Sequence, residues 1–502
     1  MFNLFLGMVV RAPLHLETPL LHAVYAAVGL GLALALYWIL VRVKVPAVVA
    51  VAVALAFTFS PSVFLYESGL HYDYPVLLAL CLAVLALLRH EDRRRPRDAA
   101  LFLALIGTLV LTRSLFHVGL FLLWAIVLVV RQREDRRRLV TALALPIVVV
   151  VGAHVHRFVV FGTPGLTSTF GVNLAKITTF QLSESERREL VARGEISAVS
   201  LVEPLSPPDR YQGLVPTPRR TGVPVLDQEL KGIYRSPPTD NEFFRTNMNS
   251  SIFLDISDRY LDDALHVMRT RPAAYLQGVA TATEIFFRPT SDFFVLVENR
   301  DRVRALDRFY NRAVFGVVAG GNGAFALPEG RLQYRQGPAR TAWLVVAAYV
   351  IAFAWGAATL VRRARRRERY GGPVLTIAFL WLTTLYVFVV SNAFEVGENN
   401  RFRLYSDPLV IALLATLVVR WRQSRSARAQ EETSGQLEPV TSEDKQLPRE
   451  LVAGSMPAQS SSTATRHPEA AALDNRAARS APARDSRVAA TRPPPSPPDS
   501  FD

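Results

Sequence analysis

Two carboxylates and a histidine stand close together in the polar segment 66–75, between two apolar runs. Glu67 and His71 are four residues apart, so they share a face if the segment is helical, whereas Asp73 joins them only if the chain turns. Carboxylates and imidazole can act as an acid–base pair or hold a divalent cation such as Mg or Mn. His71 and Asp73 are the candidate metal ligands. An ordinary solvated loop with tyrosines at the membrane interface is the alternative interpretation.

Three arginines also lie next to apolar runs. Arg113 occupies a short break between two of them, where it either extends its charge to the membrane surface or meets an anion such as a lipid phosphate. Arg401 and Arg403 closely precede the last apolar run, and paired guanidinium groups suit phosphate or pyrophosphate. Pairing with Glu395 and Glu398 in the same loop is the competing explanation.

The elements that position these residues are expected to be membrane helices. Half of the 502 residues are hydrophobic, and a hydrocarbon core about 30 Å thick needs about 20 helical residues to cross. The sequence therefore predicts an all-α polytopic membrane protein with about nine transmembrane helices. The expected spans are 19–41, 46–64, 74–89, 99–112, 116–130, 139–160, 341–361, 374–391 and 408–421.

Arginine clusters between the apolar runs predict the orientation of the chain. Short loops rich in Lys and Arg stay on the cytoplasmic side of a cell inner or plasma membrane. The clusters within 93–97, 131–138, 362–369 and 420–428 are therefore placed inside. This leaves the N-terminus and the long loop outside and the C-terminal tail in the cytoplasm. The net charge of +14 is then an orientation signal rather than a nucleic-acid surface.

The domain organisation follows from these spans. We expect an external N-terminal segment (1–18), a six-helix membrane region (19–160), an external loop domain of mixed, partly helical structure (161–340), a three-helix membrane region (341–421) and a disordered cytoplasmic tail (422–502). Within the loop, helical periodicity from Ile256 to Phe287 predicts two helices divided by Pro272. The single cysteine, Cys81, excludes a disulfide framework.

The polar segments, in this order along 19–421, resemble the GT-C class of integral-membrane glycosyltransferases, which use polyprenyl-phosphate-linked sugars. The matching features are Asp73 in His-Tyr-Asp-Tyr-Pro, Arg113 in Leu-Thr-Arg, and the run Glu-Asn-Asn-Arg-Phe-Arg before the last span. The resemblance implies inverting transfer of a sugar to an envelope glycan, lipid or protein acceptor on the external face. It implies Asp73 and Glu67 as catalytic carboxylates, and Arg113, Arg401 and Arg403 as binding residues for the donor phosphate.

One feature of that class has no counterpart. Its members carry a catalytic acidic residue in a first external loop, after a first span that runs outward, and here only Glu17 is a carboxylate in that region. If the first span is numbered as the family's second, all nine spans run in the same direction as their counterparts in the family, so we expect a truncated or inactive variant. The competing hypothesis is a non-enzymatic membrane protein of envelope assembly or lipid-intermediate transport. Because the charges lie at span ends, a site at the external interface is favoured over a transport path.

Overall fold

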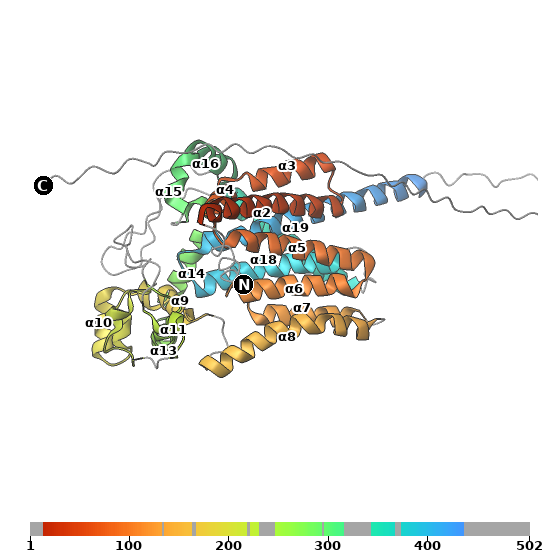
Figure 1. Cartoon of the computed structure of the whole chain (residues 1–502). Helices are drawn as coiled ribbons and strands as arrows, with labels where there is room; N and C mark the ends of the chain where they lie inside the picture. Colours follow the sequence, from red (N-terminus) through yellow and green to blue (C-terminus); the bar gives the residue numbers. More distant parts are fainter. Residues whose placement is uncertain are drawn as a thin grey trace, which may run out of the picture. The chain divides into compact units, whose positions relative to one another are not determined.

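The computed structural model describes most of the chain up to residue 435 (Figure 1). The described ranges are 14–132, 135–162, 167–217, 221–229, 246–293, 296–315, 343–366 and 373–435. Within them the chain forms helices and no β-strand. The expectation of an all-helical protein is confirmed for these residues.

Six of the described helices are long and apolar enough to cross a membrane. They are α2 (Leu14–Arg42), α5 (Asp73–Arg93), α8 (Arg136–Phe161), α17 (Trp343–Arg366), α18 (Val374–Phe394) and α19 (Asn399–Gly435). Helices α3 (Ala47–Thr58) and α4 (Pro61–Ser68) meet at a bend of 56° and add a seventh span if the pair is counted as one. Pro61 begins α4, where its missing N–H leaves no bond unmade.

Two of the expected spans are helices shorter than the six membrane-spanning ones. Helix α6 (Pro96–Thr112) has 17 residues and α7 (Val118–Arg131) has 14. Between them the backbone is extended at Arg113, and the imidazole of His117 caps α7 by accepting from the N–H of Gly119 at 3.1 Å. Both helices belong to the main core with their neighbours, so they are part of the bundle whatever their number of crossings.

Helix α19 differs most from the expected boundaries. It begins at Asn399 rather than 408 and continues to Gly435, with Pro408 inside it. Residues 422–435 are therefore helical, so the prediction of a disordered tail beginning at 422 is wrong for this part. The polar run before Pro408 forms the first turns of this helix, because the side chains there make buried contacts that a loop composition does not reveal. The remainder of the tail, like residues 1–13, lies outside the described residues.

The long segment between α8 and α17 has a hydrophobic core of its own. Helix α9 (Phe170–Ile177) packs against α13 (Ile252–Thr270) and α14 (Pro272–Phe286). The predicted division at Pro272 is confirmed, since this proline occupies the first turn of α14. The contacts are close: a Cβ at Gly171 would lie 1.8 Å from the carbonyl oxygen of Ser257. Shorter helices complete this part: α10 (Glu184–Ala192), α11 (Pro224–Asp227), α15 (Val297–Arg300) and α16 (Arg304–Tyr310).

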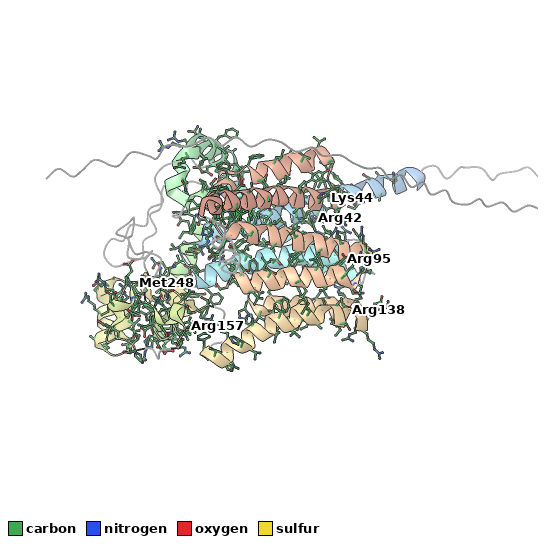
Figure 2. All side chains as sticks on the ribbon, in the orientation of Figure 1. Arg42, Lys44, Arg95, Arg138, Arg157 and Met248 are labelled. Carbon is green, nitrogen blue, oxygen red and sulfur yellow. The ribbon has the colours of Figure 1, made fainter. Side chains whose placement is uncertain are left out.

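The two ends of the helix bundle differ in charge. Arg42, Lys44, Arg95 and Arg138 gather at one end, which we call the basic end (Figure 2). Helix α5 runs from Asp73 to Arg93 and ends two residues before Arg95, so its last residue lies at the basic end and its first residue at the opposite end. We call this opposite end the Asp73 end.

Candidate functional site

Asp73 is the centre of a buried polar cluster at the first turn of α5. One carboxylate oxygen, Oδ2, accepts from Nε of Arg401 and lies 2.9 Å from Nδ1 of His71. The other, Oδ1, accepts from the hydroxyl of Tyr405 and lies 3.5 Å from Nε of Arg113. The carboxylate is fully buried, so these groups replace the water that would otherwise solvate its charge.

Arg113 reaches this cluster from the break between α6 and α7. Its Nε donates to the hydroxyl of Tyr405 at 3.0 Å, and Nη1 donates to the hydroxyl of Tyr72. Its guanidinium carbon lies 5.0 Å from the centre of the Tyr72 ring and 5.1 Å from that of Phe402. Burial and the nearby Arg401 lower the pKa of Arg113, but Asp73 and the tyrosine hydroxyls outweigh them and the pKa is raised. The guanidinium therefore stays charged.

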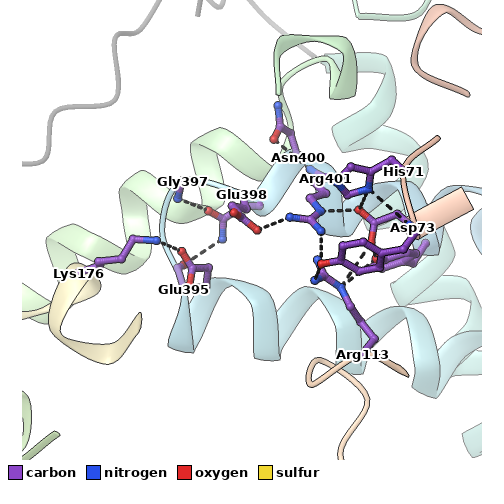
Figure 3. A network of polar contacts seen from close by, with 12 residues as sticks. His71, Asp73, Arg113, Lys176, Glu395, Gly397, Glu398, Asn400 and Arg401 are labelled. Atoms are coloured by element: carbon purple, nitrogen blue, oxygen red, sulfur yellow. Dashed lines mark hydrogen bonds and ion pairs between the residues drawn. The ribbon is translucent and has the colours of Figure 1, made fainter. Parts of the chain in front are cut away.

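Arg401 enters from the first turn of α19 and brings a second cation to the same carboxylate. Nη1 donates to Oε2 of Glu398 at 2.7 Å, and Nη2 donates to the hydroxyl of Tyr72. One tyrosine hydroxyl thus accepts from both guanidinium groups (Figure 3). Two like charges lie side by side because Asp73 and Glu398 compensate them.

A second ion pair extends the cluster toward α9. Lys176 donates to Oε1 of Glu395, in the turn between α18 and α19 (Figure 3). The side-chain amide of Asn399 holds this turn by donating to the carbonyl oxygens of Ser391 at 2.9 Å and Glu395 at 3.0 Å. Gly397 adopts φ 119° there, a conformation that residues with side chains rarely adopt.

The two glutamates of this turn differ in their pKa. Burial raises the pKa of Glu395 to about 7, although Lys176 opposes the shift. Burial also disfavours ionisation of Glu398, but Arg401 and Lys176 outweigh it and the pKa of Glu398 is lowered. Glu398 is therefore ionised at neutral pH, and its side chain keeps 29% of its surface exposed.

The structure brings together four of the six residues singled out from the sequence: His71, Asp73, Arg113 and Arg401. Glu67 instead accepts from the hydroxyl of Tyr74 at 2.7 Å, and its described contacts include none of the arginines. For the expected cation, no group of three or more His, Cys, Asp or Glu that could hold a metal occurs among the described residues.

Arg403 points away from the cluster. Its Nη1 donates to the carbonyl oxygens of Phe286, at 2.8 Å, and Arg288, while Nη2 donates to Oγ1 of Thr290 at 2.7 Å. Its Nε lies 3.4 Å from Asp407. Almost completely buried, Arg403 fastens the C-terminal end of α14 to α19.

The tyrosines of the cluster were not among the residues singled out from the sequence. Tyr72 joins the two arginines to each other, and Tyr405 joins Arg113 to Asp73. Tyr72 lies between His71 and Asp73 in the chain, and Tyr405 lies two residues after Arg403. Tyr66 lies beside them, with its ring centre 5.3 Å from that of His71. The hydroxyl of Tyr66 is buried and has no hydrogen-bond partner among the described residues, and the same holds for Nη2 of Arg113. The signal that could have identified these tyrosines is their closeness in the chain to the charged candidate residues.

Fold and cluster together define an all-helical protein with several apolar helices of membrane-spanning length and a buried charge cluster where the helices end. Comparison of the chain with family models, with curated proteins and with solved structures gave no match.

Proposed function

We propose that the protein is a membrane glycosyltransferase that moves a sugar from a polyprenyl-phosphate donor to an acceptor on the external face. One observation carries this proposal: Arg113 and Arg401 converge on one carboxylate, although Arg401 and Asp73 are 328 residues apart in the chain. Two guanidinium groups at the end of membrane helices suit a lipid phosphate, which is held at the same depth.

The proposed topology has nine passes with the basic end in the cytoplasm. The arginine clusters that flank α6 and α7, around Arg97 and Arg131, belong to short loops that the charge rule keeps inside. If both helices cross, Arg113 lies at the opposite surface, where it meets Asp73. Shortness of these helices is compatible with crossing where polar ends reach the interface. The segment between α8 and α17 is then external, and Glu395 and Lys176 link it to the bundle.

Within this proposal Asp73 is a positioning residue. A fully buried carboxylate surrounded by two arginines, a tyrosine and a histidine is a poor proton acceptor, and its effect is to hold the guanidinium groups in place. Arg401 lowers the pKa of Glu398 as well, but this side chain is partly exposed, so Glu398 is the carboxylate of the pair that an acceptor hydroxyl can reach. Glu67 is assigned no part in the step, since it bonds to Tyr74.

The proposed step balances as an inverting substitution. Glu398 takes the proton of the acceptor hydroxyl, whose oxygen bonds to the anomeric carbon of the donor sugar. The bond from this carbon to the phosphate oxygen breaks, and polyprenyl phosphate leaves with the electron pair. Arg113 and Arg401 stabilise the negative charge that develops on the phosphate. A divalent cation, if one is used, would assist the same departure.

The test is sugar transfer by the full chain in lipid nanodiscs. A panel of polyprenyl-phosphate-linked sugars is supplied with lipid and glycan acceptors, and release of polyprenyl phosphate is measured. We expect Arg401→Ala to lower release by about 100-fold, the effect of removing one donor to a developing anion. Arg422→Ala, an exposed arginine on the far part of α19, is the matched control and should leave release unchanged.

A specific observation also favours the non-enzymatic alternative. Each carboxylate of the cluster already faces an arginine or a lysine, so the cluster is balanced without a ligand. A lipid-intermediate carrier or envelope assembly protein would bind the polyprenyl phosphate without releasing it from sugar. This alternative would be supported if the parent protein retained labelled donor, released no polyprenyl phosphate from any donor, and lost the retention in Arg401→Ala. If Arg401→Ala matched the parent protein in both release and retention of the donor, the cluster would be removed from either function.

A further inference from the structure

A basic and apolar surface lies outside the Asp73 cluster, on the helical run 304–315. This run consists of α16 followed by a π-helical turn, Asn311–Phe315. Asp307 and Asn311 form its inward face and are buried. Asp307 accepts from Oγ of Ser291 at 2.6 Å and from Nε of Arg300 at 2.7 Å. These bonds fix which side of the run faces outward.

The outward side combines apolar and basic residues. Phe309 is 71% exposed and Leu306 is 42% exposed, so two large apolar side chains lie outside the core on this short helix. Arg304, Arg308 and Arg312 are exposed as well, and their four-residue spacing places them along one stripe. We call these five residues the α16 surface.

The α16 surface lies beside helices that expose apolar residues. Helix α16 packs against α4, which follows α3 across the bend (Figure 1). Val48 on α3 is 82% exposed and Phe59, the residue that follows α3, is 65% exposed, as expected of a surface that faces lipid. Phe59 lies in the turn between α3 and α4, and α4 contacts both α3 and α16. This is the Asp73 end of the bundle, because α4 leads through a short turn to α5.

We propose that the α16 surface binds the anionic headgroups of membrane lipids in the leaflet at the Asp73 end. Phe309 and Leu306 enter the boundary between headgroups and acyl chains, while the arginine stripe contacts lipid phosphates. The arginines do not serve orientation, since the charge rule applies to short loops and these lie in a long one. The proposal does not depend on sugar transfer, and it commits to a lipid surface rather than an acidic protein.

A probe at position 309 tests the depth of this surface. The full-length variant Phe309→Cys is labelled with a polarity-sensitive fluorophore and reconstituted into nanodiscs; Cys81 is buried, and the parent protein controls for its labelling. Ser185→Cys, exposed on α10, is the matched site away from α16. We expect a lipid nitroxide just below the headgroups to quench the probe at 309, and aqueous iodide to quench the probe at 185. Equal iodide quenching at both sites would overturn the proposal.

Charge reversal tests the headgroup. Replacing zwitterionic lipid with anionic lipid should increase nitroxide quenching at 309 by about twofold, because arginines near an anionic lipid surface are attracted to it. Arg304→Glu, Arg308→Glu and Arg312→Glu together should abolish this increase. The same reversal at the exposed Arg210, Arg259 and Arg269 is the control for net charge and should preserve it. Quenching that ignores lipid charge, or that rises only when an acidic protein is added, would contradict a lipid headgroup as the ligand.

Discussion

Arg401 and Arg403 stand two residues apart on α19, and both are buried, yet they act in opposite ways. Arg401 pairs with two carboxylates and shares one hydroxyl acceptor with a second arginine, so its positive charge is what stabilises the cluster. The two terminal nitrogens of Arg403 donate to two carbonyl oxygens and a threonine hydroxyl, and only its Nε approaches a carboxylate, that of Asp407 at 3.4 Å. The number and direction of its N–H groups therefore matter more than its charge. An arginine close to a span end is therefore informative about function only once its hydrogen-bond acceptors are known.

Removing the carboxylate should have the largest effect on the Arg401 side. Asp73→Ala leaves Arg113 and Arg401 facing each other in a buried setting, and we expect it to lower the free energy of unfolding by about 3–5 kcal/mol. Unfolding by a denaturing detergent in mixed micelles is the measurement. The double variant Asp73→Asn with Arg401→Gln should lose less than the sum of its single variants, because the pair is coupled. Additive losses would show that the two side chains do not interact.

On the Arg403 side, donor geometry rather than charge should decide stability. Arg403→Lys keeps the charge but one ammonium cannot serve three separated acceptors, so we expect a loss of about 2–3 kcal/mol, close to that of Arg403→Ala. Arg401→Lys retains the charge that Asp73 and Glu398 require and should lose clearly less than Arg401→Ala. The same unfolding assay compares the four variants. If lysine rescued both positions equally, the comparison between the two arginines would fail.

The sequence allowed part of this arrangement to be predicted. Apolar runs predicted the long helices, and Pro272 predicted the division between α13 and α14. Charges at span ends identified Asp73, Arg113 and Arg401 as candidates, although nothing local shows that residues 328 apart meet. Residues two apart on a helix point in directions about 160° apart. Arg401 and Arg403 could therefore bind one phosphate together only if 399–408 were a loop. The different roles of Arg401 and Arg403 could therefore not be predicted without knowing that α19 begins at Asn399.

The link between the bundle and α9 should respond to pH. Burial raises the pKa of Glu395 to about 7 from an ordinary value of 4.5, so the folded state holds this proton more tightly than the unfolded chain does. Its contribution to stability is thus fully present below pH 4.5 and is lost as the pH rises through about 7. We expect the melting temperature to fall over this window, and Glu395→Gln to flatten the fall. Glu189→Gln, an exposed glutamate on α10, should retain the parental slope, and an unchanged slope in Glu395→Gln would refute the assignment.

The smallest expected effect separates the packing of the cluster from its capacity to bind a ligand. Tyr66→Phe removes a buried hydroxyl that has no hydrogen-bond partner among the described residues, so it should leave stability unchanged or raise it by about 1 kcal/mol. Tyr72→Phe removes a hydroxyl that accepts from both arginines and should lower stability instead. If the phosphate of a polyprenyl donor accepts from Tyr66, then Tyr66→Phe should weaken donor binding without any loss of stability. Equal donor affinity in Tyr66→Phe and the parent protein would mean that only the arginines contact the phosphate. If Tyr66→Phe were destabilised, the hydroxyl of Tyr66 would belong to the packed network, as that of Tyr72 does.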